Sequence, residues 1–176
     1  MIQASIPLIG VVAYSGTGKT TLLEKVLPLI SHGGIRLGVI KHAHHSFEMD
    51  TPGKDSYRLR EAGAQQMLLA SNKQWVLMQQ HTLEDEPRLQ DCVNRLDQSQ
   101  LDLIIIEGFK HEAYPKIELH RPSLGKDLIY PTDDTVKAIA TDEPDKLDTQ
   151  LPILDINDPA AIANYILAHV LGRADA

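Results

Sequence analysis

Apolar residues occur along the N-terminal part of the chain as short continuous runs that alternate with helical periodicity. The run from Ile6 to Ala13 is almost continuously apolar, which is typical of a strand buried on both faces of a parallel sheet. From Lys19 onward the apolar residues fall on one helical face, and Gly33-Gly34 ends that helix. A second run over Leu37–His42 predicts the next strand. Such a strand, helix and strand form a βαβ unit, whose crossover makes the two strands parallel.

Beyond this unit the pattern predicts a loop, a β-hairpin and further strands and helices. The segment from Ala43 to Lys54 is polar and shows neither the helical nor the strand periodicity. We therefore expect a loop there, long enough to have a function of its own. Two strand-like runs separated by three polar residues predict an antiparallel hairpin, which would make the sheet mixed. The further expected elements are a helix over Asp55–Ala62, hairpin strands over Gln66–Ala70 and Gln74–Gln80, a helix over Leu89–Leu96, and strands over Leu101–Ile106, Lys116–His120 (at a sheet edge) and Val136–Ala140.

The last helix and the size of the chain complete the expected architecture. Asp158 is placed as the N-cap and Pro159 as the first helical residue, before a face of apolar residues that extends to Val170. With 176 residues and 43% hydrophobic content, the chain can form one well-packed core. We therefore expect a single α/β domain over residues 1–176, with three layers and a mostly parallel, partly mixed sheet.

The charge balance and the single cysteine narrow the kinds of partner. The 17 basic and 24 acidic residues give a net charge of −7, which argues against nucleic acid or an anionic membrane as a partner. Cys92 is the one cysteine, so an internal disulfide is excluded, and no apolar stretch approaches the roughly 20 residues of a membrane span. We expect a cytoplasmic protein. If it binds phosphate, the basic residues that do so must be concentrated at one site.

The segment from Ala13 to Thr20 fits the phosphate-loop pattern Gly-x4-Gly-Lys-[Ser/Thr], except that Ala13 replaces the first glycine. Its glycines let backbone amides converge on phosphate at a helix N-terminus, Lys19 reaches the β- and γ-phosphates, and the Thr20 hydroxyl binds Mg²⁺. The alternative is a glycine-rich turn with a solvated lysine, which the flanking strand and helix disfavour. The predicted triphosphate-binding residues of this P-loop domain are Ser15, Gly16, Thr17, Gly18, Lys19, Thr20 and Thr21.

Acidic residues near strand ends are candidates to complete a magnesium site. Glu107 ends the apolar strand and precedes a glycine, so we interpret it as the Walker B acid and, with Lys19, as a catalytic residue; the alternative is an exposed strand-end glutamate. Asp102 begins the same strand at the far edge and is expected to be structural. In the loop after the second strand, Asp50 is the preferred third metal ligand, because Asp55 resembles a helix N-cap.

Three histidines in that loop form the most metal-like cluster of the sequence. His42 with His44 or His45 offers imidazole ligands for a soft divalent ion, but no cysteine lies nearby to complete a tight site. The alternative, favoured by the ligand count, is that these rings line a switch loop and bind a carboxylate or phosphate.

Four segments together resemble the molybdopterin-guanine dinucleotide biosynthesis adaptor proteins, the MobB family. They are Tyr14 to Thr21, Ile40 to His45 with its three histidines, Asp50 to Ser56 with Gly-Lys-Asp-Ser, and Glu107 to His111. The resemblance implies a homodimeric GTP-binding protein of the dimerising P-loop GTPase group, with Mg²⁺ and weak intrinsic hydrolysis. It also implies that the protein assists the guanylyltransferase that joins GMP to molybdopterin, alongside molybdenum-insertion proteins.

The sequence lacks the Asn-Lys-x-Asp run with which GTPases usually recognise guanine. Asp142, after a buried strand, is the nearest substitute; the alternative is a turn-forming aspartate before Glu143-Pro144. No arginine finger is evident, with Arg58 and Arg60 candidates by location alone, and its absence agrees with slow turnover. Two other functions remain open, an ATP-dependent phosphotransferase or ligase of the dethiobiotin synthetase type, and a metallochaperone GTPase that carries its ion on the histidines.

Overall fold

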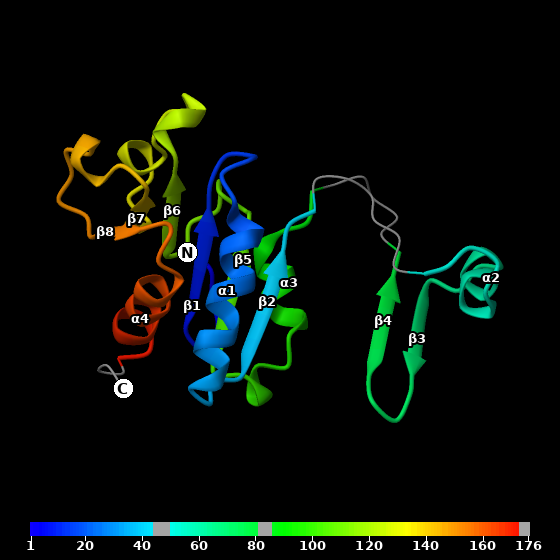
Figure 1. Ribbon diagram of the computed structural model, residues 1–176. Helices are drawn as coiled ribbons and strands as arrows, with labels where there is room; N and C mark the ends of the chain where they lie inside the picture. The colour runs from blue at the N-terminus through cyan, green and yellow to red at the C-terminus, as the bar shows by residue number, and fades with distance from the viewer. Residues whose placement is uncertain (44–49, 81–85, 173–176) are drawn as a thin grey trace. The chain divides into compact units, whose positions relative to one another are not determined.

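The computed structural model describes residues 1–43, 50–80 and 86–172. By internal contacts the chain divides into two compact units (Figure 1). The large unit comprises Met1–His42 and Pro87–Ala176, and the small unit comprises Ala43–Glu86. Each unit has its own sheet.

The large unit is built on a six-stranded sheet in which every pairing is parallel. Because parallel strands all end at the same edge, the loops that follow them meet there, and this edge is where ligands of such sheets bind. The phosphate-loop strand β1 lies between β5 and β6, near the middle of this edge. The order of the strands is β2 (Leu37–Lys41), β5 (Leu103–Glu107), β1 (Leu8–Val12), β6 (Lys116–His120), β7 (Val136–Thr141) and β8 (Ile153–Asp155).

Helices cover both faces of this sheet, which gives the three layers that the sequence predicts. On one face α1 (Lys19–His32) and α4 (Pro159–Val170) share a core with the side chains of alternate strand residues. On the other face α3 (Leu89–Arg95) packs over a second core. The carboxylate of Asp158 accepts hydrogen bonds from the amides of Ala160 and Ala161, so the predicted N-cap of α4 is confirmed. None of the helices in the described ranges is long and apolar enough to cross a membrane.

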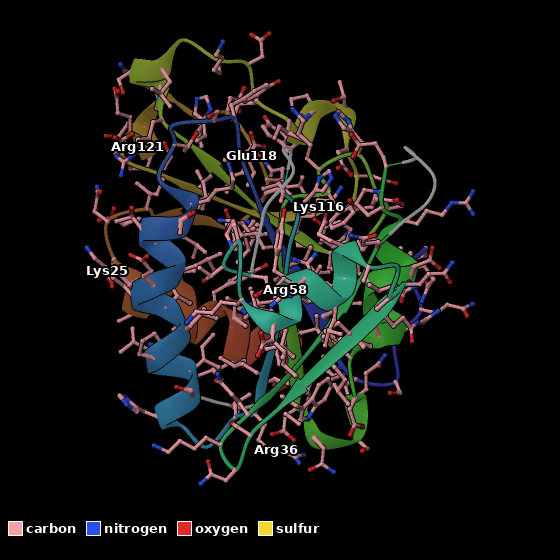
Figure 2. The ribbon with its side chains drawn as sticks, turned by 90° about the vertical axis from the view of Figure 1, so that its right-hand side faces the viewer. Lys25, Arg36, Arg58, Lys116, Glu118 and Arg121 are labelled. Atoms are coloured by element: carbon pink, nitrogen blue, oxygen red, sulfur yellow. The ribbon has the colours of Figure 1, made fainter. Side chains whose placement is uncertain are left out.

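One strand prediction is wrong, because β6 is a central strand and not an edge strand. All five of its residues are buried, including Lys116 and Glu118, which Figure 2 labels. The Lys116 ammonium binds the Asp133 carboxylate at 2.5 Å, and the Glu118 carboxylate accepts the amides of Ile129 and Tyr130 at 2.8 and 2.9 Å. The polar alternation of the sequence thus reflects buried groups that are paired with the loop before β7, since burial requires such partners.

The small unit contains α2 (Asp55–Glu61) and the antiparallel hairpin of β3 (Gln66–Ala70) and β4 (Trp75–Gln79). The predicted hairpin is therefore confirmed, as is the α/β fold class, although the antiparallel pair forms a sheet of its own. The N-cap of α2 is Lys54, so the assignment of Asp55 as the cap is wrong by one residue. Asp55 stands in the first turn instead, where a carboxylate is favoured by the helix dipole.

Short 3₁₀ turns complete the loops of the large unit. They lie at Gln98–Gln100, Pro122–Leu124, Tyr130–Thr132 and Pro144–Lys146.

At the amino-terminal edge of the sheet, Asp102 forms a bidentate pair with Arg36, with distances of 3.0 Å to Nε and 2.8 Å to Nη2. This pairing confirms that Asp102 is structural.

Candidate functional site

The phosphate loop has a backbone that requires its glycines. Gly16 and Gly18 have φ values of 83° and 100°, which lie in the left-handed region that other residues rarely adopt. Gly18 is also the N-cap of α1 and has no side chain over the first amides, so these donors face the loop. Of the predicted phosphate-binding residues, Thr17 is buried and donates to the Tyr14 carbonyl at 2.9 Å. The exposed ones are Ser15, Gly16, Gly18, Thr20 and Thr21.

The Lys19 side chain folds back over this loop. Its ammonium donates to the carbonyls of Ala13 and Tyr14 at 3.1 and 3.2 Å. Burial lowers the pKa of Lys19, Glu107 opposes this shift, and the cations of Lys110 and Lys41 add to it. Three ammonium groups therefore converge here in a chain of net charge −7, which makes the loop a local site for an anion.

Lys110 also borders a pocket of about 340 Å³ beside the loop. Its ammonium lies 4.7 Å from the centre of the Tyr14 ring, a cation–π distance. His111 and the segment before β7 complete the pocket wall. The pocket gives a ligand on the phosphate loop open space on the side of Tyr14.

Thr20, Glu107 and Lys41 form a compact cation site at the end of β5. The Thr20 hydroxyl donates to Oε1 of Glu107 at 3.1 Å, and the Lys41 ammonium lies 3.2 and 3.1 Å from the two carboxylate oxygens. Lys41 is opposite Glu107 in the parallel register of β2 and β5, which explains the contact. A hydroxyl and a carboxylate oxygen that already share a cation are hard ligands of the type that Mg²⁺ prefers, so these residues fit that ion.

The turn after Glu107 is strained and is fixed from two sides. Gly108 and Phe109 have φ values of 104° and 51°, and Phe109 is the only described non-glycine residue with a positive φ. The His42 ring stacks on Phe109 with centroids 4.4 Å apart, and the His42 amide donates to the Glu107 carbonyl at 2.9 Å. Strain of this kind persists only where the surroundings hold it, and it is typical of functional sites.

Tyr114 is the residue of this region that sequence reasoning missed. It is fully buried, its hydroxyl donates to the Gly108 carbonyl, and burial raises its pKa. A Cβ atom on Gly10 would overlap the Tyr114 ring, so β1 needs glycine at that position. The signal in the sequence was Gly10 itself, because a glycine inside a buried strand marks a close approach of another group.

Asp142 lies directly after β7, and Arg121 lies directly after β6. The Arg121 guanidinium binds Oδ2 of Asp142 at 2.5 Å, while Oδ1 is buried and has no hydrogen-bond partner among the described residues. Figure 2 shows Arg121 near the N-terminal end of α1, away from Arg36 at the other end. An unpaired carboxylate oxygen is costly, and a ligand with N–H donors would relieve that cost.

Asp50 belongs to the small unit. Its carboxylate accepts the Ser56 hydroxyl at 2.9 Å and lies 3.4 Å from the Arg60 guanidinium, which itself lies over the Tyr57 ring. The structure thus gives Asp50 local partners, and its assignment to Mg²⁺ stays a prediction. His44 and His45 lie outside the described residues. Within the described ranges no three His, Cys, Asp or Glu side chains gather as a metal site.

Comparison with known proteins gives concordant matches. The family model described as "Molybdopterin guanine dinucleotide synthesis protein B" matches residues 8–142. The "Molybdopterin-guanine dinucleotide biosynthesis adapter protein" of Escherichia coli is 48% identical over 94% of both chains, and that of Haemophilus influenzae is 44% identical over 92% of this chain and 88% of its own. The crystal structure of Bacillus subtilis MobB matches with a TM-score of 0.73 and 27% identity over 96% of this chain and 100% of its own.

Proposed function

The chain belongs to the molybdopterin guanine dinucleotide synthesis protein B family, and we propose that its phosphate loop binds GTP together with Mg²⁺. As in the relatives that carry the name, its role is that of an adapter in molybdopterin-guanine dinucleotide biosynthesis. The observation that carries the proposal is the pairing of the phosphate loop with the Thr20–Glu107 site at the same edge of the sheet.

Each group at this edge has a distinct part in holding a triphosphate. The amides at the start of α1 and the Lys19 ammonium neutralise phosphate oxygens. To reach the phosphate, the ammonium gives up its hydrogen bonds to the two loop carbonyls. The Thr20 hydroxyl and the Glu107 carboxylate hold Mg²⁺, which when bound offsets charge on the β- and γ-phosphates. Lys41, which contacts this carboxylate, would then be available to the phosphates as a second cation.

Hydrolysis by this chain alone is proposed to be slow. Of the two arginines that sequence position favoured, Arg58 and Arg60, the second is paired with Asp50 in the small unit. An arginine finger is worth roughly 10³ to 10⁵ in rate where it is present. We expect nucleotide binding, rather than rapid turnover, to be the useful event.

Guanine would be selected by Asp142. An ionised carboxylate only accepts hydrogen bonds, and guanine offers N–H donors at N1 and N2, whereas adenine offers an acceptor at N1. Oδ1 of Asp142 is the oxygen that remains without a partner in the described residues. The oxygen is buried, so a bound base must turn the carboxylate towards itself.

Partners follow from the family role. The guanylyltransferase that joins GMP to molybdopterin and the molybdenum-insertion proteins are the proteins that such an adapter would contact. We also expect a homodimer, and the small unit supports this, because its hairpin exposes Leu68, Trp75 and Leu77 by 58, 69 and 49%. Exposed apolar groups on a two-stranded sheet are typical of an interaction surface.

A binding measurement tests the core of the proposal. Titration of the full chain with GTP and Mg²⁺ should show one site, and Lys19→Ala should weaken it at least about tenfold, the usual loss for a hydrogen bond to a charged group. Lys25→Ala, on the exposed side of α1, is the matched control and should bind as the parent does. Unchanged affinity of Lys19→Ala would exclude the phosphate loop as the binding site.

A second experiment separates the adapter from the other functions. GTP-dependent capture of the guanylyltransferase by this chain supports the adapter role. Rapid phosphate release with a small metabolite would instead favour a ligase of the dethiobiotin synthetase type. Stoichiometric metal binding that is lost on replacing His42 would favour the metallochaperone.

A further inference from the structure

One guanidinium at the carboxyl edge of the sheet contacts three loops besides its own. Arg121, after β6, donates from Nη1 to Asp142 at 2.5 Å and from Nη2 to Oδ1 of Asn157 at 3.1 Å. Its Nε donates to the Thr17 carbonyl of the phosphate loop at 3.3 Å. Arg121 therefore joins the loops after β1, β6, β7 and β8 with a single side chain.

The loop that carries Asn157 is held by hydrogen bonds from two of its backbone amides. The Asn157 amide donates to Oδ1 of Asp155 at 2.7 Å, and the Ile156 amide donates to the Thr141 carbonyl at 3.1 Å. Asp158 caps α4 immediately afterwards. Asn157 itself is exposed, so a small polar side chain is presented to solvent from a hydrogen-bonded turn.

The contact with Arg121 fixes which end of the Asn157 amide is available. Arginine has no acceptor, so the Asn157 atom that it contacts must be the carbonyl oxygen. The amide nitrogen, with its two N–H donors, is left as the end that can meet a ligand. Arg121 thus contacts both the Asp142 carboxylate, which accepts hydrogen bonds, and the Asn157 side chain, whose amide nitrogen donates them.

We infer that Asn157 and Asp142, both positioned by Arg121, read the Watson–Crick edge of a 6-oxopurine. The carboxylate accepts the ring N1–H, and the Asn157 amide donates to the 6-oxo group. A 6-aminopurine presents the opposite pattern, with an acceptor at N1 and a donor at position 6, so both contacts would fail for it. The inference rests on the proposed nucleotide binding at the phosphate loop, and it adds Asn157 as a specificity residue and Arg121 as a positioning residue.

The position in the sheet agrees with this reading. The triphosphate site lies at the end of β1, and β6, β7 and β8 follow in order to one side of it. Asp142 and Asn157 come from the second and third of these strands, so the proposed base contacts are displaced laterally from the phosphate loop along the same edge. The Arg121–Thr17 hydrogen bond is the direct link between the two ends.

The test compares the affinities of GTP, ITP and ATP for the full chain and for Asn157→Ala. GTP and ITP share the 6-oxo group, so both should bind about five- to tenfold more weakly to the variant, as for one lost hydrogen bond, while ATP affinity is unchanged. Asn164→Ala, an exposed asparagine within α4, is the matched control. An equal loss for all three nucleotides, or none, would overturn the base-reading role of Asn157.

Arg121 is tested by its own pair of variants. Arg121→Gln should lower the ratio of GTP to ATP affinity more than Asn157→Ala does, because it releases both Asp142 and Asn157. Arg121→Lys keeps one charge, cannot reach three acceptors in one plane, and should recover the ratio only in part. Circular dichroism and thermal melting confirm that both variants fold. A parent chain that binds no nucleotide would contradict the proposed function, whereas a parent that binds GTP and ATP alike would contradict this inference alone.

Discussion

Lys41 lies opposite Glu107 in the sheet register, and its ammonium is 3.1 and 3.2 Å from the two carboxylate oxygens of that residue. The same ammonium is 3.4 Å from the Thr20 hydroxyl. A protein cation thus occupies the position where the proposed metal would bind. The carboxylate side chain is only 13% exposed, so it would be costly to leave it without a counter-charge.

Lys41→Met should therefore increase the apparent affinity for Mg²⁺. The substitution removes the cation that competes for Glu107 while keeping most of the side-chain length. We expect the Mg²⁺ concentration that gives half-maximal GTP binding to fall several-fold, measured by titration of Mg²⁺ at fixed GTP. Lys25→Met is the control, and a higher Mg²⁺ requirement for Lys41→Met would show that the lysine assists the metal instead.

Gly10→Ala should destabilise the large unit by about 1–3 kcal/mol, as overpacking of a core does. The added methyl group would overlap the Tyr114 ring and shift the residue that holds Gly108. Chemical denaturation measures the loss. If the clash is the cause, the cost must shrink in a Tyr114→Ala background, and equal costs in both backgrounds would point to another origin.

Asp133→Asn should remove a contribution to stability that depends on pH. Burial opposes ionisation of Asp133, but the Lys116 and Thr135 hydrogen bonds outweigh it and leave its pKa below the usual value. A carboxylate with a lowered pKa in the folded state stabilises the fold above its unfolded pKa of about 3.8, and that stability disappears as the pH falls through the folded pKa. The Lys116 side chain is 1% exposed, so the variant should lose about 3 kcal/mol near neutral pH.

Denaturation curves of the parent and of Asp133→Asn, recorded between pH 7 and strongly acidic pH, check the direction of this pH dependence of stability. The difference in unfolding free energy should narrow towards acid. Asp134→Asn, the exposed neighbour, serves as the control. A difference that widens towards acid would refute the assignment of the lowered pKa to Asp133.

Trp75→Ser should weaken self-association if the hairpin is the surface through which two copies meet. Removing Trp75, the single aromatic of β4, takes away a large exposed apolar group, so the dissociation constant should rise at least about tenfold. Analytical ultracentrifugation over a range of concentrations measures it. Gln74→Ser, at the preceding position, is the control, and a parent that is monomeric at every concentration would remove the dimer proposal.

The elements that were predicted correctly are those whose signals are local. The glycine turn between β1 and α1, the hairpin and the N-cap at Asp158 each depend on a few neighbouring residues. The β6 error arose because Lys116 and Glu118 find their partners around Asp133 and Ile129, a relationship that no periodicity reveals. The three-residue strand β8 was missed because so short a run gives too few positions to count.

In the candidate site, too, the residues that belong to local motifs could be predicted, and the contacts between distant residues could not. Lys19, Thr20 and Glu107 could be named from motifs, and the Thr20–Glu107 contact supports their joint placement. Lys41 and Arg121 could not be assigned contacts, because those depend on strand order and register, which bring together residues 66 and 21 positions apart.

The last residue of β2 is Lys41, and the large unit ends its first segment only one residue later, at His42. The polypeptide that leaves the carboxyl edge of the large sheet is thus the same one that enters the small unit, and the ring of His42 stacks on Phe109 just before the small unit begins. The residue that joins β2 to the small unit thus lies next to the lysine whose ammonium contacts Glu107.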